Sequence, residues 1–172
     1  MSATSINHTE LLCEVRGGVG LITLNRAKAL NALSLGMVRA LTAVLQAWQY
    51  DPAVQAVAIR GMGKDRHQPG ASVPFGAFCA GGDIRFFHQA ALAGDPQLED
   101  FFTEEYALNH LIHAYPKPYI AFLDGIVMGG GMGIAGHARP VLSPGQTAAS
   151  LRLVTPNTRM AMPETNIGLF PD

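Results

Sequence analysis

Cysteine is scarce in this sequence, with Cys13 and Cys79 the only two among 172 residues. Two cysteines this far apart form neither the framework of a small disulfide-rich domain nor the close ligand spacing of a zinc motif. We therefore expect two reduced thiols that pack as small apolar side chains. His110 and His113 could share one face of a helix, but no third ligand lies near them, so no metal site is expected.

Long hydrophobic runs and an excess of charge are also absent. No stretch approaches the roughly 20 apolar residues that span a bilayer. Residues 1–9 carry neither an apolar signal core nor an Arg-rich amphipathic pattern. Lys and Arg number 12 against 13 Asp and Glu, which leaves no basic footprint for nucleic acid or an anionic membrane. These absences predict a cytoplasmic protein that binds neither nucleic acid nor membrane.

The usual cofactor motifs are incomplete. Residues 131–136 match the G-x-G-x-x-G dinucleotide fingerprint. A Rossmann unit also needs an acidic residue about 20 positions later to hold the ribose, and no Asp or Glu lies between Asp124 and Glu164. This argues strongly against NAD. Residues 61–65 look faintly like a P-loop, but Ala58 stands where its first glycine belongs, and no G-x-S-x-G elbow of a serine hydrolase is found.

The sequence does contain alternating strand and helix patterns. Hydrophobic residues make up 48% of the chain, enough for one domain with a sizeable core. Ser34 is a candidate N-cap for a helix that runs to about Tyr50. The alternation predicts an α/β fold with right-handed crossovers. We expect strands at 11–15, 19–24, 54–59, 119–123 and 151–154, an extended piece at 158–162, helices at 84–91, 97–114 and 132–138, and loops at 61–77 and 140–150.

Two glycine-rich loops are the most informative feature. Residues 124–133 follow an apolar run and hold four glycines within their last five positions, and residues 78–84 hold a second glycine pair. Glycine loses more conformational entropy on folding than other residues. A glycine-rich segment therefore usually lies where the main chain must approach a ligand or another segment closely, without a side chain in between. Two such loops can aim two N–H groups at one oxygen. The alternative for the first loop alone is a tight strand-to-helix turn packed against a neighbour.

Two acidic residues near the end are candidates for chemistry. Glu164 follows an apolar segment, and Asp172 comes eight positions later. A carboxyl group in apolar surroundings can serve as a general acid or base. Taken in isolation, either residue is better explained as a helix N-cap or a salt-bridge partner.

The ordered combination of these segments resembles the enoyl-CoA hydratase/isomerase (crotonase) superfamily, and most closely its 3-hydroxyisobutyryl-CoA hydrolase branch. The resemblance implies an α/β, crotonase-like spiral of ββα units. Residues 1–172 would form the N-terminal core only, one domain that stops before the C-terminal helical region of that branch. The segments that carry the resemblance are 19–26, 29–33, 78–85, 104–106, 117–121, 124–133 and 162–172.

The resemblance also implies an activity, the hydrolysis of a 3-hydroxyacyl-CoA thioester such as 3-hydroxyisobutyryl-CoA in valine catabolism. Coenzyme A would be part of the substrate, and neither a separate cofactor nor a metal is implied. Glu164 would either attack the carbonyl or activate a water, two alternatives that the sequence leaves open. The implied site residues are catalytic Glu164 and Asp172, oxyanion-hole N–H groups at Gly82 and Gly130, and substrate-binding Gly81, Asp83, Gly129 and Gly131.

Two other functions remain open. Hydratases of the superfamily use a second glutamate directly after the glycine core, where this chain has Gly133, so hydration or isomerisation of an enoyl-CoA is disfavoured. The chain could also be an inactive acyl-CoA-binding fragment. Apolar core surfaces that the C-terminal region would otherwise cover favour association. The expected partners are therefore the acyl-CoA substrate and a possible second copy of the chain in a homo-oligomer.

Overall fold

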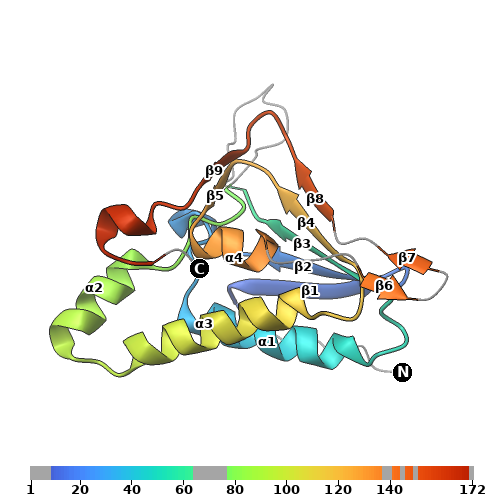
Figure 1. Cartoon of the computed structure of the whole chain (residues 1–172), viewed down its shortest axis with the longest axis horizontal. Coiled ribbons are helices and arrows are strands. Elements are labelled where there is room, and N and C mark those ends of the chain that lie inside the picture. Colours follow the sequence, from blue (N-terminus) through green and yellow to red (C-terminus); the bar gives the residue numbers. More distant parts are fainter. Residues whose placement is uncertain (1–8, 64–76, 137–140, 144–145, 149–150, 171–172) are drawn as a thin grey trace.

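The computed structural model describes residues 9–63, 77–136, 141–143, 146–148 and 151–170. Within these ranges strands and helices alternate, which confirms the predicted α/β class (Figure 1). None of the helices in these ranges has the length and apolar character that a bilayer crossing requires. The elements are β1 Leu11–Arg16, β2 Val19–Leu24, η1 Ala27–Ala29, α1 Leu35–Gln49, β3 Ala56–Gly61, α2 Ile84–Ala93, α3 Gln97–His113, β4 Tyr119–Leu123, β5 Ile126–Met128, α4 Gly130–Gly136, β6 Val141–Ser143, β7 Gln146–Ala148, β8 Leu151–Val154, β9 Arg159–Ala161 and η2 Glu164–Ile167.

The largest sheet has the strand order β1-β2-β3-β4-β8. The predicted hairpin is present: β1 and β2 pair antiparallel across a turn in which Gly17 and Gly18 both have positive φ, a conformation that glycine adopts without steric cost. The pairs β2–β3, β3–β4 and β4–β8 are all parallel. Parallel neighbours need crossover connections, which place helices over a face of the sheet.

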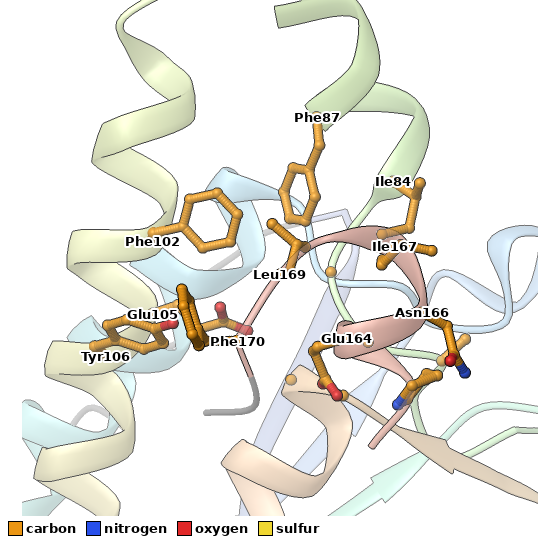
Figure 2. Close-up of a pocket in the computed structure, with 16 residues that line it drawn as sticks. Ile84, Phe87, Phe102, Glu105, Tyr106, Glu164, Asn166, Ile167, Leu169 and Phe170 are labelled. Atoms are coloured by element: carbon orange, nitrogen blue, oxygen red, sulfur yellow. The ribbon is translucent and has the colours of Figure 1, made fainter. Parts of the chain in front are cut away.

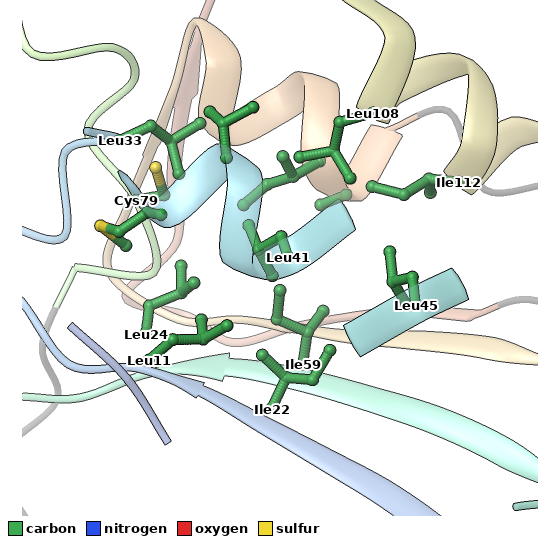
Figure 3. Packing of buried hydrophobic residues seen from close by; sticks show 14 of the residues in the cluster. Leu11, Ile22, Leu24, Leu33, Leu41, Leu45, Ile59, Cys79, Leu108 and Ile112 are labelled. Atoms are coloured by element: carbon green, nitrogen blue, oxygen red, sulfur yellow. The ribbon is translucent and has the colours of Figure 1, made fainter. Parts of the chain in front are cut away.

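Helices α1 and α3 lie together along one face of this sheet (Figure 1). Helix α1 begins where predicted, because the Ser34 hydroxyl accepts a hydrogen bond from the Met37 N–H at 3.1 Å. Its apolar stripe packs against alternate strand residues, which gives the core its continuity. Figure 3 shows this packing; its labelled members include Leu11, Ile22, Leu24, Leu41, Leu45, Ile59, Leu108 and Ile112, all buried.

A second, smaller layer of short parallel pairings follows the main strands. After β2 the chain pairs at Leu33 with Gly82, Cys79 pairs with Val127 of β5, and β5 pairs with β9. Each of the paired segments follows one strand of the main sheet along the chain. The segments lie side by side in the same order as those strands. The strand–strand–helix order of β1, β2 and α1 recurs in β4, β5 and α4. This second layer brings both glycine-rich loops and the segment before Glu164 to one end of the molecule.

The structure differs from the sequence prediction at several boundaries. Strand β5 was not predicted, since three residues between glycines show no periodicity. Helix α4 begins at Gly130 rather than Met132, and β3 begins at Ala56 rather than Val54. The predicted irregular loop at 140–150 contains the antiparallel pair β6–β7, so that prediction is wrong. The predicted loop at 61–77 lies mostly outside the described residues.

Candidate active site

The two glycine-rich loops are joined by main-chain hydrogen bonds. The Phe78 N–H donates to Asp124 O at 2.9 Å and the Cys79 N–H to Ile126 O at 3.0 Å, and the Met128 N–H donates back to Cys79 O at 3.0 Å. A Cβ added to Gly81 would lie only 3.6 Å from the Gly130 nitrogen. The structure therefore brings the loops side by side, as the sequence predicted.

The N–H directions at the two loops follow from their bonding. Gly81 O accepts from the Leu33 N–H at 2.8 Å, and the Asp83 N–H donates to Leu33 O at 3.0 Å. In a trans peptide the C=O and N–H point in opposite directions, so the Gly82 N–H points away from Leu33. Gly130 is the first residue of α4, where a helix supplies no acceptor for the N–H. The N–H groups of Gly82 and Gly130 are thus not used by the hydrogen bonds of the sheet or of the helix.

A cavity of about 250 Å³ lies against these loops. Figure 2 shows side chains from α2, α3 and the η2 segment converging on it. One side is backbone and carboxylate, and the rest is largely apolar. The lining residues are Ala80, Gly81, Gly82, Ile84, Phe87, Phe102, Glu105, Tyr106, Gly129, Gly130, Pro163, Glu164, Asn166, Ile167, Leu169 and Phe170.

Glu164 is the buried acid of this cavity. Glu164 is only 8% exposed, and neither of its carboxylate oxygens has a hydrogen-bond partner among the described residues. The Gly129 N–H donates to Ala161 O at 3.1 Å, which fixes the end of β9 beside the 124–133 loop. Glu164 follows three residues later and starts the η2 turn. Burying a carboxylate without a partner costs free energy, so a chain that keeps one makes it a candidate for a functional role. Asp172 lies outside the described residues.

Glu105 is a second acid in the cavity, and it is not among the site residues predicted from the sequence. It lies on α3, is 4% exposed, and its Oε1 occupies the space that a Gly130 side chain would need. A signal was present in the sequence: Glu105 falls on the same helical face as the buried Phe101, Leu108 and Ile112. An acid on an apolar stripe is seldom buried without a partner or a function.

Two residues predicted to bind substrate do not line the cavity. The Asp83 carboxylate is engaged by Arg26 Nη2 at 2.6 Å and accepts the first N–H groups of α2, from Arg85 and Phe86. Burial raises its pKa, but these hydrogen bonds and the Arg26 charge outweigh that effect and hold the pKa below its ordinary value. Gly131 packs against the Cys79 carbonyl instead. Both residues therefore shape the loops rather than face the cavity.

The apolar side of the cavity is built on packed aromatic rings. Phe87 of α2 meets Phe101 of α3 edge to face, with centroids 4.7 Å apart, and lies 5.0 Å from Phe102. A side chain at Gly82 would overlap the Phe87 ring. Glycine at 82 thus lets the Phe87 ring pack directly against the backbone of the loop.

The described residues contain no group of three or more His, Cys, Asp or Glu side chains arranged to hold a metal ion. The polar groups that line the described part of the cavity include two carboxylates and two backbone N–H groups. Such a set can polarise a carbonyl and move a proton.

Comparison with known families decides the relationship. The family model described as enoyl-CoA hydratase/isomerase matches residues 19–172. The chain belongs to the enoyl-CoA hydratase/isomerase family. A Xenopus tropicalis family member named mitochondrial 3-hydroxyisobutyryl-CoA hydrolase is 47% identical over 170 residues, which are 96% of this chain and 38% of that protein. The Homo sapiens protein of the same name is 42% identical, over 95% of this chain and 36% of its own length.

Solved structures of the family confirm the crotonase fold. A carnitinyl-CoA dehydratase from Mycobacterium thermoresistibile superposes with a TM-score of 0.77 and 42% identity, over 96% of this chain and 42% of its own. An enoyl-CoA hydratase from Rhodobacter sphaeroides gives a TM-score of 0.77 and 38% identity, over 95% and 42%. The chain thus spans less than half the length of these relatives, and the match falls on the core that the sequence resemblance predicted.

The predicted cytoplasmic location is wrong. The relatives from Xenopus tropicalis, Gallus gallus and Homo sapiens are all named mitochondrial, which points to the mitochondrion instead. The prediction rested on the absence of a recognisable targeting pattern in residues 1–9, and such an absence does not specify a compartment.

Proposed function

We propose that this family member hydrolyses a 3-hydroxyacyl-CoA thioester. The observation that carries the proposal is the placement of Glu164, a buried carboxylate without a described partner, beside two glycine loops that each leave one backbone N–H unused. A thioester needs both parts: donors for the charge that develops on the carbonyl oxygen, and an acid–base or nucleophilic group within reach of the carbonyl carbon.

The proposed reaction proceeds through an oxyanion. The thioester oxygen accepts hydrogen bonds from the Gly82 and Gly130 N–H groups. Glu164 either removes a proton from the attacking water or attacks the carbonyl carbon itself. In both routes the tetrahedral oxyanion collapses, the C–S bond breaks, and the coenzyme A thiolate takes up a proton. Where Glu164 attacks, this collapse leaves an anhydride that water then opens. Asp172 is proposed as the second acid, and the donors are worth about 2.7–4 kcal/mol each.

The proposed acyl group is short and carries a hydroxyl. The cavity offers apolar side chains for a branched carbon skeleton, while Glu105 presents a carboxylate from α3. The relatives named 3-hydroxyisobutyryl-CoA hydrolase support that substrate, and with it a place in valine catabolism within the mitochondrion. Coenzyme A enters as part of the substrate, and the proposed mechanism uses no further cofactor.

Enoyl-CoA hydration is the second candidate, and one observation favours it. Glu105 and Glu164 approach the same cavity from α3 and η2 (Figure 2), so two carboxylates are available to add water across a double bond. Solved relatives named as a dehydratase and a hydratase are similar to this chain as well. Gly133, which stands where family hydratases carry their second glutamate, argues against it.

The test is a panel of coenzyme A esters offered to the purified protein. Release of free coenzyme A is followed with a thiol reagent, and double-bond chemistry is followed by the ultraviolet absorbance of the enoyl thioester. We expect release from 3-hydroxyisobutyryl-CoA and little change with crotonyl-CoA. Loss of enoyl absorbance without coenzyme A release would establish hydration instead, and acyl-CoA binding with neither change would leave only a binding role.

A further inference from the structure

We propose that Arg26 orients and polarises the Gly82 N–H through a relay of two peptide planes. Arg26 belongs to the loop after β2 and does not line the cavity, so it is a positioning residue rather than a catalytic one. The inference deepens the proposed function, since it concerns the same contact to the thioester oxygen.

The relay begins at the Arg26 guanidinium. Arg26 Nη1 donates to Ala32 O at 2.9 Å. That carbonyl shares a peptide plane with the Leu33 N–H, which donates to Gly81 O at 2.8 Å. Gly81 O in turn shares a peptide plane with the Gly82 N–H. Because C=O and N–H are antiparallel in each trans plane, the chain of donors runs in one direction, from a cation to the proposed oxyanion donor.

A relay of this kind strengthens its last member. Hydrogen bonds in series polarise one another, by about 10–30% per bond, and bonds that start from a charged donor are stronger than neutral ones. Here the cation lies at the far end, so electron density is drawn away from the Gly82 N–H. That N–H becomes a better donor to a negative oxygen without any charge entering the cavity.

Arg26 also fixes the other flank of Gly82. Its Nη2 binds Asp83 Oδ2 at 2.6 Å, while Asp83 Oδ1 accepts from the Arg85 and Phe86 N–H groups. The residue after the donor is therefore held at the start of α2. With the Leu33 contacts on one side and Asp83 on the other, the peptide that carries the Gly82 N–H cannot rotate freely.

The guanidinium is itself held in place. Arg26 Nε pairs with Glu10 Oε1 at 2.9 Å, and the fully buried Asn31 accepts from the Arg26 N–H at 2.8 Å and donates its own N–H to Arg26 O at 3.0 Å. All three nitrogens of the guanidinium are thus used, each by a different part of the chain. A lysine cannot reproduce that planar fork.

The experiment measures carbonyl polarisation directly. Each variant is made in a Glu164→Gln background, so that 3-hydroxyisobutyryl-CoA labelled with ¹³C at the thioester carbonyl stays intact when bound. Isotope-edited infrared spectra then report how far binding lowers the carbonyl stretching frequency. We expect a clear downshift with Arg26 present, loss of most of it in Arg26→Met, and an intermediate value in Arg26→Lys.

Arg39→Met is the matched control. Arg39 also makes a bidentate pair, with Glu104 across α1 and α3, but it has no contact with either glycine loop. Its variant should keep the full downshift. In the Glu164 enzyme, Arg26→Met should lower kcat by up to roughly 10²-fold with little change in KM, whereas Arg39→Met should change neither.

The outcomes separate this inference from the proposed function. A full downshift in Arg26→Met would overturn the relay while leaving the oxyanion contacts in place. If Arg26→Met does not fold, Arg26→Lys decides, since a full downshift in that variant contradicts the inference. No downshift in the Glu164→Gln parent would overturn the oxyanion arrangement itself, and the relay with it.

Discussion

The point where a Gly129 Cβ would stand lies 2.6 Å from Oε1 of Glu164. The buried acid therefore rests directly on bare main chain, at a residue whose φ of +48° already favours glycine. The close contact explains why the glycine core and the distant Glu164 form one unit. It also shows that the 124–133 loop positions the acid, in addition to its proposed role as a source of one N–H donor.

Gly129→Ala should displace the Glu164 carboxylate and lower kcat by roughly 10²-fold, since small misplacements at a reacting centre cost about that much. The left-handed backbone adds a stability loss of about 1–2 kcal/mol. Gly94→Ala is the matched control, because Gly94 has a φ of +62° and nothing within 4 Å of its Cβ position. Both variants should lose similar stability in thermal melts, and only Gly129→Ala should lose activity. Normal turnover in Gly129→Ala would contradict the contact.

The lowered pKa of Asp83 predicts a specific dependence of stability on pH. Burial raises that pKa, while the Arg26 hydrogen bond and charge and the N–H groups of α2 bring it below 3.8. A carboxyl with a depressed folded-state pKa contributes stability above its unfolded value, and that stability is lost as pH falls through the folded value. Asp83→Asn should therefore be less stable than the parent near pH 6, with the gap closing below about pH 3.8. A gap in unfolding free energy that stays constant down to pH 3 would contradict this.

Both thiols should react very slowly with thiol reagents in the folded protein. Burial raises the pKa of Cys13 to about 11, and Cys79 is fully buried in the core. Because the thiolate is the reactive form, an aromatic disulfide reagent at pH 8 should titrate neither cysteine until denaturant is added. The same property keeps the coenzyme A assay free of background. Rapid modification of one thiol per chain under native conditions would be inconsistent with this burial.

Local sequence signals predicted the parts of the fold that depend on local rules. Ser34 caps α1, and the following apolar stripe packs on the sheet, because capping and periodicity are properties of neighbouring residues. Strand β5 was missed because it is defined by its partners, Cys79 and β9, rather than by its own three residues. Tertiary pairing decides such short strands.

The site was predicted in part, for a related reason. The family motifs mark Gly82, Gly130 and Glu164, and the structure places all three in the lining of one cavity, while their catalytic roles stay a prediction. The family resemblance assigned Asp83 to substrate binding, but its carboxylate is taken by Arg26, a partner 57 positions away. The apolar helical face marks Glu105 as a buried acid, but its position against Gly130 follows only from the fold. Long-range contacts of this kind are not encoded in spacing.

The most direct test of thioester hydrolysis by Glu164 is the rate of coenzyme A release from 3-hydroxyisobutyryl-CoA by Glu164→Gln. Acyl-CoA affinity is measured on the same variant by calorimetry. We predict a fall in release of roughly 10²–10⁴-fold with affinity nearly unchanged, because the amide keeps the shape of the carboxylate but neither attacks nor takes a proton. Release at the parental rate would contradict it.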